Sequence, residues 1–386
     1  MADSPKPLVP FSSWVGPRQP KLLILGEAWG EGEQIVREPF VGYSGKELWL
    51  MLGESFGDVA PEAHQQAVSM FKYDLAWVKH RRPWLEQSSI AMTNVFNFRP
   101  TSNKLEYILC PKKEACGASQ ALGSVAKGGY LMEEYLPELE RLKAELEQSR
   151  PNLVLACGNT AIWALLGSTN IGSIRGSIAD SQRLVNVKVL PTYHPAGVMR
   201  QWSWRPIVVA DLIKARREME FPEIIRPERE VFINPTLEEC QQFVSRLESN
   251  PPEILSIDVE TGFGQIKCIS FSSSPFESFV IPFFHQGHPS GSYWPTLELE
   301  REVWELVRRL CSLSSAKLGQ NFLYDLQYIT RMGIFPTNCT QDTMLFHHSL
   351  FPEMQKGLGF LGSIYTNEAS WKLMRRKRPD TEKRDE

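Results

Sequence analysis

The sequence contains no closely paired cysteines and no long apolar run. Its seven cysteines include no Cys-x-x-Cys pair, which argues against a disulfide framework and favours a reducing compartment. No stretch approaches the ~18 consecutive apolar residues that a transmembrane helix needs. The first twenty residues also lack the apolar core of a signal peptide. We therefore predict a soluble protein without a membrane partner, located in the cytoplasm, or in the host-cell cytoplasm if a phage encodes it.

The sequence also has no excess of either charge. Its 42 basic and 45 acidic residues give a net charge of −3, so any binding to nucleic acid must be local. The segment 175–217 carries eight Lys/Arg against Asp180 and Asp211, a net of +6. This segment could face phosphates, or it could be a solvated helix face, and the sequence favours neither. Apolar residues at 42% and charged residues at 23% are typical of a folded globular chain.

Short apolar runs alternate with helical patterns through the first part of the 386 residues. This alternation predicts an α/β fold whose sheet is mainly parallel and lies between two helical layers. Functional loops of such a sheet follow the carboxyl ends of the strands, on one rim. The predicted strands are 21–26, 88–96, 151–158 and 185–193, and the predicted helices are 45–52, 130–148 and 160–167.

Composition divides the chain further. Residues 219–236 carry three prolines and no periodicity and are predicted to link two domains. After them, β-rich runs predict a meander followed by helices near 297–313 and 323–332. The polar segment 101–130 is predicted to be an insertion or flexible loop. The predicted divisions are a flexible arm 1–19, a first domain 20–218, the linker 219–236, a second domain 237–374 and a charged tail 375–386.

Three loops on the predicted rim carry chemically useful residues. GEAWGEGEQIVREPFVGYSG holds glycines and two carboxylates, TNVFNFRP holds Asn94, and PTYHPAGVMR holds His194. Each signal is weak alone, because a glycine-rich loop also fits phosphate binding and Phe40 could simply be core. Asn94 could cap a turn, and His194 could be an ordinary loop residue.

These three segments and LVLACGNTAIWALLG occur in the order and approximate spacing of one known family. Over residues 20–217 the sequence resembles the uracil-DNA glycosylase superfamily, above all its thermophile-type fourth family. The resemblance implies that Phe40 stacks on an extruded uracil and that Asn94 reads the amide edge of that base. It also implies that His194 stabilises the negative charge on the leaving base.

The same resemblance assigns roles to four more residues. Glu27 corresponds to the acidic residue near the attacked sugar carbon, and Glu33 to a carboxylate that crowds the position of the thymine methyl group. Met199 or Arg200 would be the wedge that fills the gap in the base stack. These roles agree with the chemistry, because base excision passes through a cationic sugar and an anionic base and requires a flipped nucleotide.

Two departures from the fourth family affect the cofactor and the pocket. Phe98 in NFRP replaces a cysteine of the family's iron–sulfur site, and the N-terminal arm has no cysteine. The pair Cys110 and Cys116 cannot supply the four thiolates of a cluster. We therefore expect no iron–sulfur cluster and no cofactor for base excision. The second departure is Trp29, which replaces a family proline beside the active loop.

The second domain contains another set of acidic residues. In LSIDVETG, Asp258 and Glu260 lie two apart on one face of a predicted strand, and Asp325 follows in KLGQNFLYDLQYI. From about 253 to 372 the sequence resembles the DEDD 3′–5′ proofreading exonuclease of family A DNA polymerases, especially phage ones. The resemblance implies a partial ribonuclease H-like fold and possible Mg²⁺ or Mn²⁺ ligation by these three carboxylates. The family's last motif, Tyr-x3-Asp, is missing, and Asp342 matches a structural position.

Together these patterns predict a phage-like fusion of a uracil-DNA glycosylase, acting in DNA repair by base excision, with a truncated exonuclease module. The predicted partner is uracil-containing DNA, with a family A DNA polymerase chain as a further partner in DNA replication. One alternative is a metal-dependent 3′–5′ DNA exonuclease whose glycosylase-like domain only grips DNA. Another is a non-catalytic, polymerase-associated accessory that binds uracil or 3′ ends.

Overall fold

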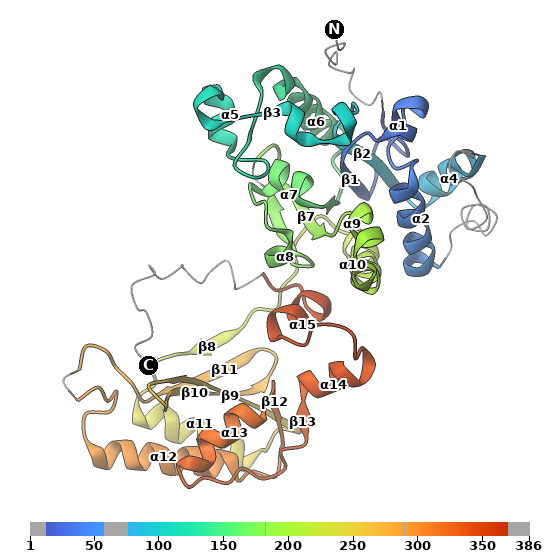
Figure 1. Cartoon of the computed structure of the whole chain (residues 1–386). Helices are drawn as coiled ribbons and strands as arrows, with labels where there is room; N and C mark the ends of the chain where they lie inside the picture. Colours follow the sequence, from blue (N-terminus) through green and yellow to red (C-terminus); the bar gives the residue numbers. More distant parts are fainter. Residues whose placement is uncertain (1–12, 58–75, 182, 289, 370–386) are drawn as a thin grey trace. The chain divides into compact units, whose positions relative to one another are not determined.

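The computed structural model describes residues 13–57, 76–181, 183–288 and 290–369. These residues form two compact units (Figure 1). Unit 1 comprises the described residues up to Ile225 together with 362–369, and unit 2 comprises Arg226–Leu361. Part of the predicted arm and the whole of the predicted tail lie outside the described residues.

A five-stranded sheet forms the centre of unit 1, in the order β2-β1-β5-β7-β6. The first four strands run parallel, and β6 pairs antiparallel at the edge. The apolar runs that predicted strands are buried throughout, as expected for a parallel sheet covered on both faces. The strands are β1 (Leu22–Ala28), β2 (Ile90–Phe96), β5 (Leu153–Cys157), β6 (Ala179–Ser181) and β7 (Val187–Thr192).

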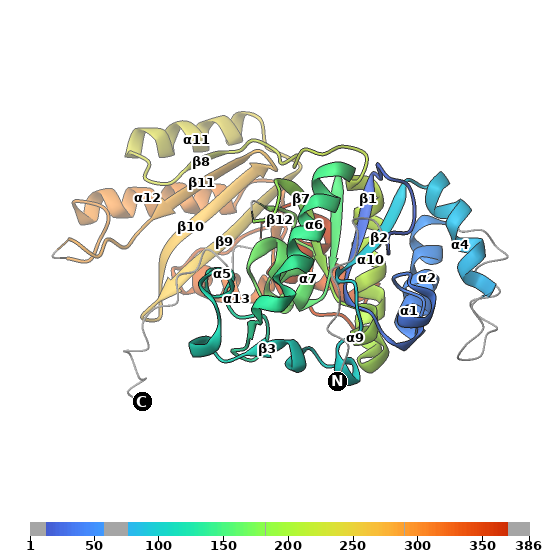
Figure 2. The same ribbon diagram turned by 90° about the horizontal axis from the view of Figure 1, so that it is seen from above.

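Alternate side chains of these strands enter two separate cores. Leu22 and Ile24 pack in one core, and Leu23 and Leu25 pack in the other. This alternation confirms the predicted three-layer α/β/α arrangement (Figures 1 and 2). One layer contains α2 (Tyr43–Phe56), α4 (Ala76–Gln87), α9 (Pro195–Arg200) and α10 (Arg205–Glu218), and the other contains α6 (Leu136–Ser149), α7 (Asn159–Leu166) and α8 (Ile171–Ile174).

The polar segment 101–130 is more regular than its composition suggests. It contains short 3-10 turns, the helix α5 (Gly117–Leu122) and a small antiparallel pair of strands. That pair joins β3 (Leu109–Cys110) to β4 (Tyr130–Leu131). The helix α1 (Glu31–Val36) belongs to the loop after β1.

Unit 2 is built on a six-stranded sheet in the order β13-β12-β9-β10-β11-β8. The antiparallel meander β9-β10-β11 is present as predicted, and β12 runs parallel to β9. This mixed sheet, with its central meander and parallel edge, is a ribonuclease H-like arrangement. The strands are β8 (Glu230–Phe232), β9 (Ile254–Gly262), β10 (Gln265–Ser274), β11 (Glu277–Pro282), β12 (Ala316–Gly319) and β13 (Gln341–Asp342).

Helices α11, α12 and α13 cover one face of this sheet (Figure 1). Their apolar sides meet Ile257, Ile269 and Phe271 in a single core. The helices of this part of the chain are α11 (Leu237–Ser249), α12 (Leu297–Cys311), α13 (Leu323–Arg331), α14 (Thr343–Leu350) and α15 (Leu358–Tyr365).

Three segments differ from the organisation that the sequence suggests. β8 lies inside the predicted linker 219–236, and because its residues are all exposed it shows no alternation that would reveal a strand. Val15, in the predicted arm, is buried and pairs with Met92 through two backbone hydrogen bonds. Residues 362–369 belong to unit 1 because the buried Lys214 Nζ donates to carbonyl oxygens of this segment.

Across the described ranges, no helix is both long enough and apolar enough to cross a membrane.

Candidate active site

The rim of unit 1 brings the predicted site residues together, beginning at Gly26. The register of β1 with β2 places Gly26 directly beside Asn94. A Cβ atom on Gly26 would lie 2.1 Å from Asn94 Oδ1 and 2.7 Å from Phe40 Cζ. The amide and the phenyl ring therefore both lie against Gly26, and only glycine leaves room for them.

We expect Gly26→Ala to weaken ligand recognition at this site more than it weakens folding. The added methyl group must displace the Asn94 amide or the Phe40 ring, and misplacing a binding group by about 1 Å costs about 10²-fold in rate. The measurement is single-turnover excision from a uracil oligonucleotide, the substrate that the sequence resemblance implies, with thermal unfolding as the folding control. Gly117→Ala, where an added Cβ meets nothing within 4 Å and the backbone is not left-handed, serves as a glycine control. Equal excision rates for Gly26→Ala and wild type would contradict this geometry.

Phe40 is held in an unusual backbone conformation. Its φ is 54°, in the left-handed region, and its side chain is buried at 4% exposure. The guanidinium of Arg81 donates to Phe40 O and to Pro39 O, both at 2.8 Å, and also to Glu38 Oε2 at 3.0 Å. On the other side, a Cβ at Gly45 would lie 1.9 Å from Phe40 O, so the helix α2 also approaches this carbonyl closely.

His194 is the N-cap residue of α9. Its Nδ1 accepts a hydrogen bond from the Ala196 amide at 3.2 Å. In a neutral ring the proton therefore lies on Nε2, which is the nitrogen left to donate to a ligand. The imidazole faces Phe40, with ring centroids 6.2 Å apart and planes inclined by 25°.

The surroundings of His194 favour this neutral form. Burial lowers the pKa of His194, while the carboxylates of Glu27 and Glu33 raise it and the charge of Arg200 lowers it further. Because burial is the largest of these effects, the pKa lies below its ordinary value.

Glu27 and Glu33 differ in how they are held. Thr160 Oγ1, in the first turn of α7, donates to Glu27 Oε2 at 2.5 Å and fixes this partly exposed carboxylate. Glu33 is 6% exposed and accepts three backbone N–H groups, from Gly30, Val41 and Gly42, each at 3.1 Å. Glu33 therefore ties α1 to the loop that carries Phe40.

Asn94 has an unused donor. Its side chain is 3% exposed, and its Nδ2 is buried without a hydrogen-bond partner in the described part of the chain. Buried polar groups are normally paired, so an orphaned donor at a site often marks a ligand contact. The backbone of Asn94 is held independently of its side chain, because Arg141 Nη2 donates to the Asn94 backbone carbonyl oxygen at 2.8 Å.

The remaining predicted residues lie nearby. Met199 and Arg200 are both exposed in the last turn of α9, with Met199 at 47%. Their roles as a DNA wedge stay predictions. Trp29 is buried at 8% exposure and its backbone N–H donates to Phe98 O at 3.0 Å. The indole Nε1 of Trp29 has no partner within the described ranges.

Three supporting residues were not identified from the sequence. Arg81 holds the Phe40 loop, Thr160 holds Glu27, and Arg141 holds the end of β2. Their partners are 41, 133 and 47 residues away along the chain. No local pattern could reveal these contacts, because each depends on how distant elements pack.

Three of the eight basic residues of the segment 175–217 are buried inside the protein. Arg175, Lys188 and Lys214 are 5%, 1% and 3% exposed. Arg175 pairs with the buried Asp211 at 2.6 Å, and Lys188 Nζ donates to three backbone carbonyls. These three cations are therefore not available to phosphates, whereas Arg200, Arg216 and Arg217 are exposed, and a contact of this segment with phosphates stays a prediction.

The cysteines do not provide a donor set for an iron–sulfur cluster. All seven cysteines lie in the described ranges, where no group of three or more His, Cys, Asp or Glu could hold a metal ion. Cys110 is buried with its Sγ 3.5 Å from Tyr130 O. Phe98 instead stacks on Tyr135, with centroids 5.3 Å apart. These residues do not fit a four-cysteine cluster.

The acidic residues of unit 2 are only partly gathered. Asp258 and Glu260 both have solvent-accessible side chains on β9. The protein atoms around Asp258 still displace part of its hydration, and this partial desolvation, followed by the charge of Glu260, raises the pKa of Asp258. Burial raises the pKa of Asp325 to about 6, although its Oδ1 accepts the Val259 amide at 2.9 Å. Among the described residues, Asp258, Glu260 and Asp325 do not form a cluster of three side chains that could bind one metal ion. Asp342 caps α14, as its structural assignment implied.

A parallel α/β/α sheet with a polar site on its carboxyl rim defines unit 1 as a ligand-binding α/β protein. The comparison with known families is more specific. The model "Uracil DNA glycosylase superfamily" matches residues 13–217, and the chain belongs to that superfamily.

Two curated relatives match the same part of the chain. It is 27% identical over 207 residues to a type-4 uracil-DNA glycosylase of Archaeoglobus fulgidus, covering 52% of this chain and 77% of the relative. It is 23% identical over 211 residues to the type-4 enzyme of Saccharolobus solfataricus, covering 53% and 74%.

A search of solved structures matched Escherichia coli RNase D, an exoribonuclease, at 12% identity and a TM-score of 0.27. That match covers 39% of this chain, which spans only 36% of the RNase D chain. The ribonuclease H-like description of unit 2 rests on its own strand order.

Proposed function

We propose that unit 1 is a uracil-DNA glycosylase that flips uracil out of DNA and hydrolyses its N-glycosidic bond. The observation that supports this most is the grouping around the Phe40 ring. Phe40 and the Asn94 amide, whose Nδ2 is an unpartnered donor, both lie against Gly26, and the His194 imidazole faces the same ring. These groups suit a pyrimidine, which has a flat face and a polar edge. The family relationship supports the choice of uracil.

Three side chains are proposed to contact the base, each in a different way. Phe40 stacks on the flipped base, and Asn94 Nδ2 donates to a carbonyl oxygen of uracil. His194 Nε2–H donates to the oxygen that becomes negative as the bond to the sugar lengthens. A fixed donor of this kind stabilises the transition state more than the ground state.

On the sugar side, the Glu27 carboxylate stabilises the positive charge that develops at C1′. It also orients a water molecule, whose oxygen forms the new bond to C1′ while one of its protons passes to Glu27. The electron pair of the broken bond leaves with the base, which then takes a proton from solvent. Met199 and Arg200 are the proposed wedge in the DNA stack, and Glu33 is proposed to crowd a thymine methyl group.

The test is incubation of the full chain with single- and double-stranded oligonucleotides that carry one uracil, followed by hot alkali. Cleavage at the uracil position is expected, with matched thymine strands left intact. Absence of scission in both substrates would contradict the proposed function.

We expect the purified, active chain to contain no iron. Cys110 and Cys116 are the two cysteines closest together in the sequence, whereas a cluster needs four thiolates. Inductively coupled plasma mass spectrometry measures the metal content, and anaerobic purification controls for cluster loss. Excision that survives exhaustive chelation is expected, and a near-stoichiometric iron content would show that this expectation is wrong.

The second candidate function is a metal-dependent 3′–5′ DNA exonuclease in unit 2. The raised pKa values of Asp258 and Asp325 favour it, because crowded carboxylates often serve a cation. We derive no step through a metal, since three described carboxylates do not gather around one position. Degradation of DNA without uracil, dependent on Mg²⁺ or Mn²⁺ and abolished by Asp258→Ala, would support this function. A polymerase partner stays a prediction.

A further inference from the structure

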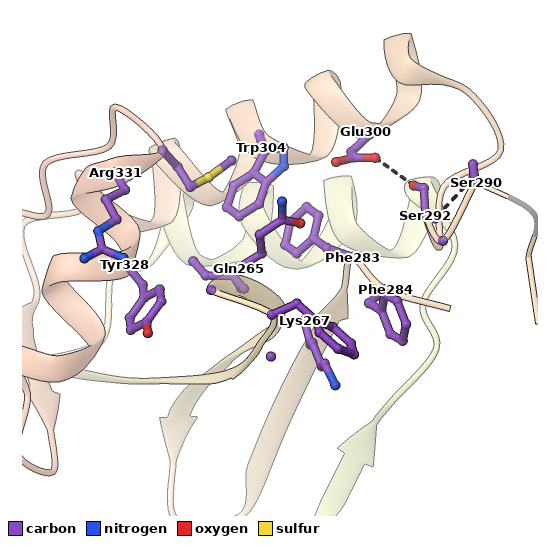
Figure 3. Close-up of a pocket in the computed structure, with 16 residues that line it drawn as sticks. Gln265, Lys267, Phe283, Phe284, Ser290, Ser292, Glu300, Trp304, Tyr328 and Arg331 are labelled. Carbon is purple, nitrogen blue, oxygen red and sulfur yellow. Dashed lines mark hydrogen bonds between the residues drawn. The ribbon is translucent and has the colours of Figure 1, made fainter. Parts of the chain in front are cut away.

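Unit 2 contains a cavity of about 510 Å³ that the predicted functions do not use. It is bounded by the turn between β9 and β10, by α12 and by α13 (Figure 3). The acidic residues Asp258, Glu260 and Asp325 are not among its lining residues. A cavity of this size is in the range of small-ligand sites and can hold one nucleotide-sized molecule.

Besides the buried Phe283 the lining holds four aromatic rings, of which two are exposed and two are half-buried. Phe263 lies in the turn with a φ of 54°, a left-handed conformation that bulky residues rarely adopt, and its side chain is 90% exposed. Phe284 is 38% exposed, and Trp304 stacks on the buried Phe283 with centroids 3.8 Å apart. Tyr328 adds a further ring from α13 (Figure 3). Exposed flat faces of this kind stack on nucleobases.

Two cations accompany the rings. Lys267 Nζ lies 5.1 Å from the ring centroids of both Phe263 and Phe284. A Cβ at Gly262 would lie 2.0 Å from Lys267 Cε, so the glycine makes room for this lysine. Arg331 lies over Tyr328, with its Cζ 5.0 Å from the ring centroid.

The cavity lining carries positive charge that can bind an anionic ligand. Neither Lys267 nor Arg331 forms an ion pair within the residues that the structure describes. The only acidic lining residue is Glu300, and its Oε2 accepts a hydrogen bond from Ser292 Oγ at 2.7 Å. The cavity therefore combines stacking surfaces with two cations that have no internal acidic partner.

We propose that this cavity binds one nucleotide unit, with its base stacked on the exposed rings and its phosphate near Lys267 and Arg331. Rings interleaved with cations are the usual means of holding a single nucleic-acid strand without sequence preference. An apolar ligand would leave both cations unused, and an inorganic anion would leave the rings unused. The unit can come from a free nucleoside monophosphate or from single-stranded DNA.

The test is ultraviolet cross-linking of the full chain, followed by peptide mapping. One probe is 5-bromo-2′-deoxyuridine 5′-monophosphate, and the other is a short single strand with 5-bromouracil at its 3′ end. Cross-links are expected at Phe263, Phe284, Trp304 or Tyr328. Labelling by the mononucleotide identifies free nucleotide as a source, and labelling by the strand identifies DNA. Because the glycosylase site lies in other peptides, loss of labelling there leaves this proposal intact.

Variants separate binding from incidental labelling. We expect Arg331→Ala and Lys267→Ala each to reduce the mapped yield about tenfold, because each removes a phosphate contact beside a stacking ring. Arg331 is exposed, so its removal does not disturb the core, and Arg331→Lys should restore most of the yield. Arg308→Ala is the matched control, since Arg308 is an exposed cation of α12 that pairs with Glu305 outside the cavity. No labelling in unit 2, or equal labelling of all variants, would overturn the proposal.

Discussion

Uracil excision by His194→Asn is expected to be about 10²–10³-fold slower than by the wild-type chain, the usual loss when one donor to a developing oxyanion is removed. The imidazole supplies that donor through Nε2, because Nδ1 already accepts the Ala196 amide. Asparagine is chosen because it is a favourable N-cap residue and can still accept that amide. The start of α9 should therefore be preserved while the donor is lost.

Single-turnover rates on a single-stranded uracil oligonucleotide measure this effect, and binding to an uncleavable analogue shows whether the site still forms. His348→Asn is the matched control, because His348 is exposed on α14 and distant in sequence from the site. Its excision rate should equal that of the wild type. A His194→Asn rate within a few-fold of wild type would remove His194 from the proposed mechanism.

The pH dependence of excision should follow the same imidazole. Burial lowers the pKa of His194 below its ordinary value of 6.5, so the ring is neutral throughout the neutral range. The rate should therefore change little with pH near neutrality and should decline only in acid, once the ring becomes protonated.

Stability should change with pH in the same direction. Below the ordinary pKa the unfolded chain binds more protons than the folded chain, so the free energy of unfolding falls as pH falls. The contribution of neutral His194 to the free energy of unfolding is complete above the ordinary pKa and is lost as pH falls through the lower pKa of the folded state. His194→Asn should have a shallower acid decline, measured by urea unfolding, and an unchanged slope would contradict this assignment.

The elements of the fold that the sequence predicts are those with a strong local signal. β1, β2, β5 and β7 are mainly apolar and buried because both faces of their sheet are covered, although β7 includes Lys188. α12 and α13 are amphipathic because only one side of each meets the core. β8 has neither signal, since its three exposed residues form a strand only through pairing with β11.

In the candidate site, too, the residues with a sequence motif were predicted and the features without one were not. Glu27, Phe40, Asn94 and His194 were identified because they lie in motifs of a known family, and the structure brings them together. Their geometry was not predictable, since the φ of Phe40 depends on Arg81 and the proton position of His194 depends on a cap hydrogen bond. The cavity at Phe263 and Lys267 has no motif, because its lining comes from the β9–β10 turn, the residues 283–284 and 290–292, α12 and the end of α13.

Arg81→Met is expected to lower the free energy of unfolding of unit 1 by about 3–5 kcal/mol, the usual cost of removing one partner of a buried ion pair. Arg81 is 1% exposed and donates to two carbonyls of the Phe40 loop as well as to Glu38. Methionine fills similar space but leaves those carbonyls without their donor. The Glu38 carboxylate, with an exposed fraction of 10%, would keep only its contact with Arg82.

Arg82→Met is a close control, because Arg82 pairs with the same carboxylate but its side chain is 60% exposed. An exposed pair contributes about 0–1 kcal/mol, so this variant should unfold at nearly the wild-type urea concentration. Tryptophan fluorescence can follow the unfolding of unit 1, since Trp77 and Trp84 lie on the same helix as Arg81. Excision should also slow in Arg81→Met under conditions where it is fully folded, because Phe40 loses the contacts that hold its left-handed backbone. Equal urea midpoints for Arg81→Met and Arg82→Met would show that the loop is held by packing against α2 alone.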